Sequence, residues 1–124
     1  MQRDQMLTLD ILAAARLITS FTAGYDEASF SADAKTLAAA LHELMIIGEA
    51  VKGLSVEFRT QHAEIPWRNM SRMRDLLIHR YHNVDLPTVW LTIMRDIPIL
   101  IVALEPVAPL ASDGDSINDG DDAL

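Results

Sequence analysis

Apolar side chains recur at spacings of three and four residues along most of this chain, and this pattern constrains its fold more than any other feature. The clearest run covers residues 4–22, and the spacing returns in 31–51, 66–82 and 85–104. Such spacing lines one side of a helix with apolar residues. No segment alternates apolar and polar residues as a half-buried strand does. The sequence therefore predicts an all-α, up-and-down bundle of four or five helices.

Punctuating residues predict where these helices begin and end. Gly24 is a plausible stop for the first helix, and Ser31 could cap the second with its hydroxyl. Gly48 indicates either a tight helix contact or a break. Pro66 suits the first turn of the third helix. Further expectations are a separate short helix over 55–62, a cap at Asp85 with Pro87 in the first turn, and a kink at Pro98.

Length and composition bound the class of protein. With 124 residues, half of them apolar, the chain is expected to form one domain with a real core. It has no cysteine, so neither a disulfide nor a thiolate metal site can form, which fits a reducing cytosol. Charges interrupt the longest apolar runs before the length of a membrane span, and no signal core follows the N-terminus. We expect a cytoplasmic protein without membrane insertion.

The net charge of −8 is unevenly distributed along the chain. Residues 106–124 hold five aspartates and no base, together with two prolines and two glycines. This composition predicts a disordered acidic tail, either passively solubilising or in contact with a basic site or a partner. Removing those five acids from the total of 18 leaves 13 against 10 bases, or −3, for a folded domain over residues 1–105.

The stretch from Pro66 to Arg95 is locally basic, with five arginines. The chain has no glycine-rich phosphate loop and no nucleophile elbow. His79 and His82 have a spacing that metal ligands can use, but no Glu-x-x-His pair accompanies them. The sequence therefore predicts neither a metal site nor another cofactor.

Arg74 and His79 are the residues in this stretch that could carry chemistry. A guanidinium fork matches a phosphate bidentately, and an imidazole exchanges protons near neutral pH. Together the two could cleave RNA without a metal, the arginine stabilising the phosphorane charge and the histidine transferring the proton. Taken alone, the same residues are more typical of a surface ion pair and a histidine near a helix end.

Helical geometry separates the two residues. A spacing of five places Arg74 and His79 about 140° apart, whereas Arg74 and Tyr81, seven apart, would lie on nearly one face. Either the helix ends near His79 and the chain turns, or a second copy completes the site across a two-fold axis.

Four separated blocks resemble the HepT-like family of HEPN-domain proteins, in matching order and spacing. The blocks are IIGEA (46–50), EIPW (64–67), RDLLIHRY (74–81) and VDLPTVW (84–90). The decisive motif is Arg-x4-His-x-Tyr, met by Arg74, His79 and Tyr81. The resemblance implies an all-helical homodimer that is the toxin of a two-gene toxin–antitoxin module. It further implies a metal-independent endoribonuclease whose arginine and histidine meet at the dimer interface.

Roles for single residues follow from the resemblance. Arg74 would bind and polarise the scissile phosphate of an RNA substrate, His79 would act as general acid and base, and Asp75 would orient one of them. The antitoxin, a minimal nucleotidyltransferase of the MntA type, would neutralise the toxin by transferring AMP to Tyr81. Arg80 departs from the family pattern and either contacts RNA phosphate or is solvated.

Other interpretations stay open. The protein could be a non-catalytic subunit whose cleft binds a nucleotide or the nucleotidyltransferase. Glu49 could pair with a motif arginine, while Gly48 allows close helix packing. Trp67 and Trp90 are expected to pack in the core or the dimer interface rather than stack on bases.

Overall fold

A computed structural model describes residues 2–108 of the chain, and this part is helical with no strand. The helices are α1 (Gln2–Thr22), α2 (Glu27–Ala32), α3 (Ala34–Gly53), α4 (Val56–Gln61), α5 (Trp67–Arg80), α6 (Leu86–Leu91) and α7 (Ile97–Leu104). A 3-10 turn, η1 (Tyr81–Asn83), follows α5, and a π-helical segment, η2 (Thr92–Asp96), joins α6 to α7. The predicted all-α architecture is confirmed.

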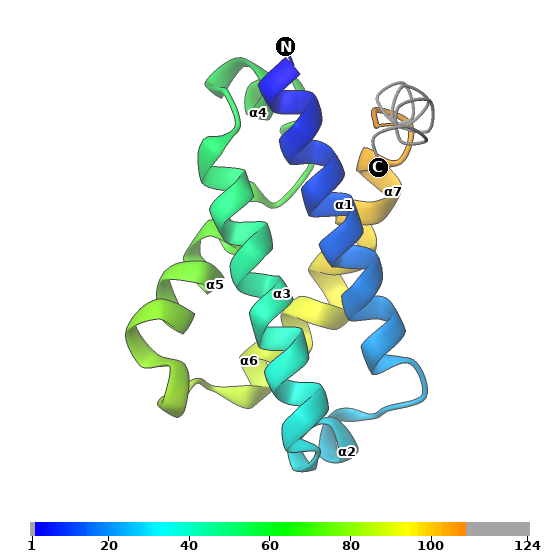
Figure 1. The fold of residues 1–124 in the computed structure, drawn as a ribbon, viewed down its shortest axis with the longest axis vertical. Helices are drawn as coiled ribbons and strands as arrows, with labels where there is room; N and C mark the ends of the chain where they lie inside the picture. The colour runs from blue at the N-terminus through cyan, green and yellow to red at the C-terminus, as the bar shows by residue number, and fades with distance from the viewer. Residues whose placement is uncertain (1, 109–124) are drawn as a thin grey trace, which may run out of the picture.

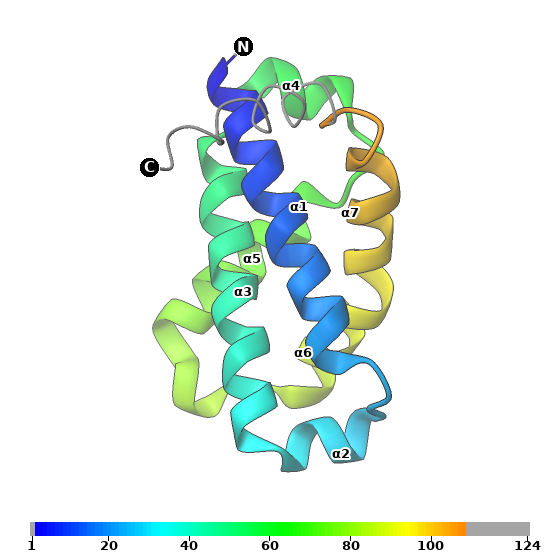
Figure 2. The same cartoon turned by 45° about the vertical axis from the view of Figure 1, so that its right-hand side comes forward.

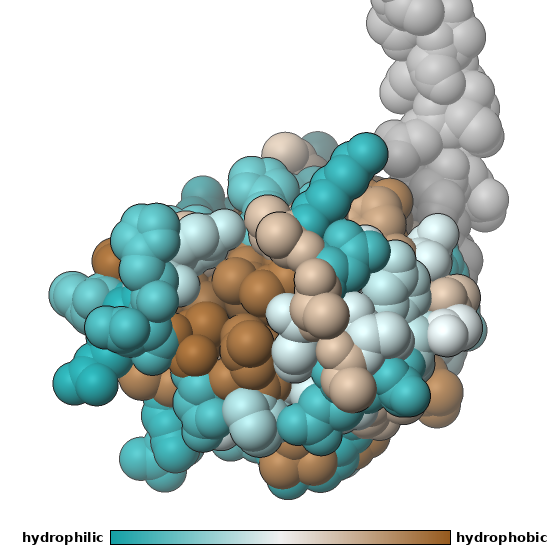
Figure 3. Space-filling view, turned by 90° about the horizontal axis from the view of Figure 1, so that it is seen from below, coloured by the Kyte–Doolittle hydropathy of each residue, from teal (hydrophilic) through white to brown (hydrophobic). Residues whose placement is uncertain are grey.

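The long helices form a bundle around α3. Helix α3 packs along α1 on one side and against α5 on the other, while α7 packs on α1 (Figures 1 and 2). The short helices α2 and α4 lie at opposite ends of the bundle. The core consists of aliphatic side chains from the long helices, and Phe30 of α2 closes one end with its ring 5.0 Å from that of Trp90. Seen from the α2 end, apolar surface also gathers in the middle of the face (Figure 3).

Side-chain caps set the starts of α2, α3 and α4, and one expected cap is wrong. The predicted helix from Ser31 instead begins at Ala34, where the Asp33 carboxylate accepts from the Thr36 N–H. Ser31 belongs to α2, a short helix whose capping box joins Asp26 and Ser29. An aspartate two residues downstream therefore provides the cap in place of the serine.

The two prolines of the last helical segment lie at helix starts. Pro87 is in the first turn of α6 after Asp85, as expected, although Asp85 bonds the Thr88 hydroxyl and not a backbone N–H. Pro98 is in the first turn of α7. The wider π turn before it, in which the Ile97 N–H reaches the Thr92 carbonyl, accommodates a residue that has no N–H to donate.

The indole of Trp67 at the start of α5 is hydrogen-bonded to the end of α4. Its N–H donates to the carbonyls of Arg59 (3.1 Å) and His62 (3.0 Å) at the end of α4, and Trp67 is 9% exposed. Trp90 is half-buried against Phe30. The predicted core packing is confirmed for Trp67, while Trp90 packs against the core and stays partly exposed.

Asp4 is a buried carboxylate that ties α1 to the start of α4. It accepts hydrogen bonds from the Ser55 N–H (2.9 Å) and hydroxyl (2.7 Å) and is 6% exposed. Burial alone raises the pKa of Asp4, but the bonds from Ser55 outweigh burial and leave this pKa below its ordinary value. A carboxyl group with a lowered folded-state pKa stabilises the fold fully at neutral pH, and the contribution is lost as the pH falls toward that pKa.

Replacing Asp4 by alanine is expected to lower the free energy of unfolding by about 1–3 kcal/mol at neutral pH, because Ser55 loses both acceptors. The matched control is Asp10→Ala, which removes an exposed carboxylate from the same helix. Urea unfolding should show the difference between the variants shrinking as the pH falls through the acid range. Equal midpoints for the two variants at neutral pH would contradict this role for Asp4.

The segment after α7 is described only as far as residue 108. The chain continues as a turn past residue 105 to Ala108, which is buried, while the rest of the expected acidic tail lies outside the described residues.

The segment Leu86–Leu104 is long and apolar enough to cross a membrane by length and composition, with 33% of its window buried in the domain. The core helix of a soluble protein passes the same test, and this segment contains the ion pair of Arg95 with Asp96 (3.0 Å). The length and composition of the segment are therefore weak evidence for a membrane span.

Candidate active site on helix α5

Helix α5 divides its residues between the core and the surface. Its buried side consists of Trp67, Met70, Met73 and Leu77. Arg68, Arg72 and His79 lie on the exposed side, while Arg74 and Asp75 are half-buried. Four arginines against one aspartate make this helix strongly basic within an acidic protein.

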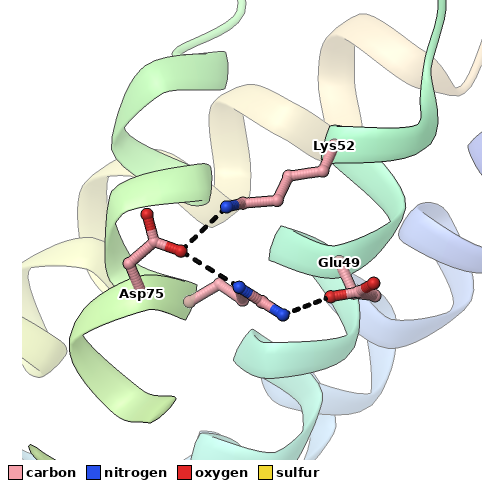
Figure 4. A network of polar contacts seen from close by, with 4 residues as sticks. Glu49, Lys52 and Asp75 are labelled. Carbon is pink, nitrogen blue, oxygen red and sulfur yellow. Dashed lines mark hydrogen bonds and ion pairs between the residues drawn. The ribbon is translucent and has the colours of Figure 1, made fainter. Parts of the chain in front are cut away.

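Arg74 lies in a network of alternating charges between α3 and α5. Figure 4 labels the other three members, Glu49, Lys52 and Asp75. Its two terminal nitrogens contact Glu49 Oε1 at 2.8 Å and Asp75 Oδ1 at 3.1 Å. The same Asp75 oxygen accepts from Lys52 Nζ at 2.9 Å. The hypothesis that Glu49 pairs with a motif arginine is confirmed. Lys52 was not predicted, although its position one helical turn after Glu49 was a signal that could have found it.

Gly48 brings the backbone of α3 directly against Arg74. A Cβ atom added at Gly48 would lie 2.1 Å from Arg74 Cβ and 2.9 Å from the Met70 carbonyl oxygen. Because any side chain there overlaps α5, the close approach of the two helices requires glycine at this position. The tight helix contact predicted at Gly48 is confirmed.

The network fixes the guanidinium and neutralises it locally. Two carboxylates and two cations sum to zero, and the Arg74 side chain is 25% exposed with its Nε buried and unpartnered within the described residues. Hydrogen bonds from Lys52 and Arg74 hold the pKa of Asp75 below its ordinary value, which keeps this carboxylate charged at neutral pH. Each terminal nitrogen of Arg74 still has a second N–H that can bind an anion.

His79 lies apart from this network. It is exposed in the last turn of α5, and no hydrogen bond joins it to Arg74. The helix runs unbroken from Arg74 to Arg80, so their 140° separation holds. The chain turns only after His79, which means that the turn does not bring this side chain back to Arg74. A single protomer does not bring Arg74 and His79 together.

Tyr81 does not share a helix face with Arg74, contrary to the prediction. Arg80 has the non-helical dihedrals φ −139° and ψ 38°, so α5 ends there and Tyr81 opens the 3-10 turn. Tyr81 is 38% exposed, and its ring lies edge-on to that of His82, with ring centroids 5.4 Å apart. Arg80 forms no ion pair within residues 2–108 and borders a small groove between α5 and α6.

No three His, Asp or Glu side chains of residues 2–108 lie close enough together to hold a metal ion. His79 and His82, the pair with ligand-like spacing, fall on opposite sides of the break between α5 and η1.

The chain belongs to the Ribonuclease HepT-like family, which residues 11–107 match. This family is part of the HEPN superfamily. The helical bundle described above is therefore that of a HEPN-superfamily domain.

Several curated proteins are similar over most of this domain. A "Probable ribonuclease HepT" of Thermococcus cleftensis is 47% identical over 91 residues, which cover 73% of this chain and 83% of that protein. A "Putative RNase" of Caldanaerobacter subterraneus is 39% identical over 90 residues, 73% of this chain and 80% of its own length. A "Putative RNase" of Methanocaldococcus jannaschii is 35% identical over 98 residues, 79% and 81% of the two chains. No solved structure gives a significant match.

Proposed function

We propose that the protein is a cytoplasmic toxin that cleaves RNA without a metal, using Arg74 and His79, and that a minimal nucleotidyltransferase antitoxin neutralises it. The observation that carries the proposal is the α5 motif: a guanidinium held by Glu49 and Asp75 on one side and an exposed imidazole on another. Relatives named as ribonucleases support the substrate class.

The chemistry requires a second copy of the chain. Because one protomer keeps Arg74 and His79 on different sides of α5, we infer that a two-fold homodimer brings the arginine of one copy to the histidine of the other. Leu76 and Ile78, 38% and 45% exposed, flank His79 and supply apolar contact surface for such an interface.

In the proposed reaction the 2′-oxygen of the RNA attacks the adjacent phosphorus while His79 of one copy takes the 2′-hydroxyl proton. The bond from phosphorus to the 5′-oxygen then breaks, and the same His79, now protonated, gives that oxygen its proton. Arg74 of the other copy compensates the charge that develops on the phosphoryl oxygens through its remaining N–H groups. Asp75 and Glu49 hold the guanidinium in place.

Cleavage is expected for RNA but not for DNA of the same sequence, because DNA lacks the attacking 2′-hydroxyl. The purified protein should cut single-stranded RNA at an undiminished rate in EDTA. The products are resolved on a denaturing gel. Cleavage of the DNA strand, or loss of RNA cleavage in EDTA that added metal restores, would contradict this mechanism.

Tyr81 is the proposed acceptor of AMP. Its exposed phenolic oxygen would attack the α-phosphate of ATP bound to the antitoxin, forming a phosphodiester and releasing pyrophosphate and a proton. The adenylate adds bulk and negative charge close to His79. Intact mass after incubation with the partner and ATP should rise by one or more adenylates in the wild type and not in Tyr81→Phe. An equal gain in both would exclude Tyr81.

One observation favours a second function, that of a non-catalytic binding subunit. The charge of Arg74 is already balanced by two carboxylates, as in a structural network. A wild-type protein that binds the nucleotidyltransferase but cleaves no RNA would establish this alternative.

A further inference from the structure

A second basic site lies at the other end of α5. Arg59 of α4 and Arg68 of α5 form no ion pair within residues 2–108. Arg3, Lys35, Arg72 and Arg80 form none either, so Arg59 and Arg68 are set apart by bordering one hollow together. Two neighbouring cations repel each other when no carboxylate lies between them, and this protein has an excess of acids that could have provided one. Their position together indicates a surface for an external anion.

The two arginines border one open hollow of about 460 Å³ between α4 and α5. Its other lining residues are Val56, Thr60, Trp67 and Ser71, so no carboxylate faces it. The Ser71 hydroxyl makes no hydrogen bond within the described residues and can donate to a ligand. The hollow therefore combines two cations with a free hydroxyl donor.

The hollow is held in shape by the core. Trp67 anchors the carbonyl of Arg59 through its indole N–H (3.1 Å), which fixes the end of α4 beside the start of α5. The Arg59 Nε atom is buried and has no acceptor within the described residues.

We propose that this hollow binds a backbone phosphate of the RNA strand, flanking the phosphate that is cleaved; this inference rests on the proposed function. Arg68, Arg72 and His79 lie within about 40° of one another around the axis of α5. Arg68 precedes His79 by about 16 Å along that axis. A strand held by the hollow can thus follow the exposed side of α5, past Arg72, to the end that carries His79.

The test uses Arg59→Gln/Arg68→Gln, which retains much of each aliphatic stem, in a His79→Ala background that prevents cleavage. Binding of fluorescein-labelled single-stranded RNA is measured by anisotropy over a range of salt concentrations. The matched control is Lys35→Gln at the start of α3, which removes an exposed charge that forms no ion pair within residues 2–108. Thermal unfolding checks the fold, and the single variant Arg68→Gln replaces the double one if the latter does not fold.

The double variant is expected to bind RNA roughly tenfold more weakly or worse, because it can no longer donate charged hydrogen bonds to phosphate. The slope of log K against log salt should become shallower by about 0.7 for each phosphate that the protein no longer neutralises. With His79 intact, KM for RNA should rise while kcat stays close to that of the wild type.

Unchanged affinity and slope in the double variant, when the wild-type protein cleaves RNA, would overturn the phosphate site alone. An equal loss of affinity in Lys35→Gln would also overturn it, because the effect would then be one of overall charge. A parent that neither binds nor cleaves RNA would remove the proposed function, and the phosphate site with it.

Discussion

The His79→Ala protein is expected to cleave RNA about 100- to 10,000-fold more slowly than the wild type, the range that a general acid and base contributes. His79 is exposed and lies outside the core, so its removal should leave the fold and the thermal unfolding midpoint unchanged. A slower cleavage rate at an unchanged unfolding midpoint would then show that His79 takes part in the chemical step. Initial rates on a labelled RNA in EDTA give the comparison.

His82→Ala is the matched control for this prediction, because His82 is also exposed and lies three residues further along in η1. Its rate should stay close to that of the wild type. If both histidine variants cleaved as fast as the wild type, any RNA cleavage would come from other residues or from a contaminant.

Replacing Gly48 by alanine is expected to give the largest structural effect of any single methyl group added to this chain. The new Cβ would lie 2.1 Å from Arg74 Cβ, a distance at which both helices must move. Alanine favours a helix over glycine by about 1 kcal/mol, but forced overpacking commonly costs about 1–3 kcal/mol, and here the obstruction includes backbone. We expect lower stability and slower cleavage together, because Arg74 moves with α5.

Gly53→Ala separates this overlap from a general effect of glycine in α3. Its added Cβ would meet the ends of the flexible side chains of Leu7 and Arg3, at 3.0 and 3.1 Å. Those ends can shift, so chemical denaturation should show a change well below that of Gly48→Ala. Equal unfolding midpoints for Gly48→Ala and the wild type would show that α3 and α5 are not held as closely as the structure has them.

The long helices were predictable because burying one side of a helix requires apolar residues at spacings of three and four. Ile11, Leu44 and Leu100 belong to segments whose apolar spacing alone indicates a helix, and all three are buried. Helix α2 was not predicted, because its stability comes from the local capping box and from the single buried ring of Phe30, and not from a repeated apolar spacing. Asp33 provides the cap expected from a serine, and its carboxylate also binds Tyr25 and Thr36 and so holds the connection between the two helices.

Part of the candidate site followed from spacing within one helix. The separation of Arg74 and His79 was predictable because α5 is continuous between them. The position of Tyr81 was not, because no glycine or proline marks the helix end at Arg80. The contacts of Arg74 depend on a second helix: the pairing with Glu49 was predicted as one option, but the role of Lys52 and the hollow beside Arg59 depend on how the helices around α5 pack.

The central claim is that Arg74 and His79 act on one phosphate although α5 presents them on different sides. The most direct measurement is the rate of RNA cleavage in EDTA by an equimolar mixture of Arg74→Ala and His79→Ala proteins after subunit exchange. Each variant alone should be inactive, while the mixture should recover up to about a quarter of the wild-type rate, because each mixed dimer retains one intact site. A mixture in which mixed dimers have formed, yet which is no faster than its components, would contradict the account.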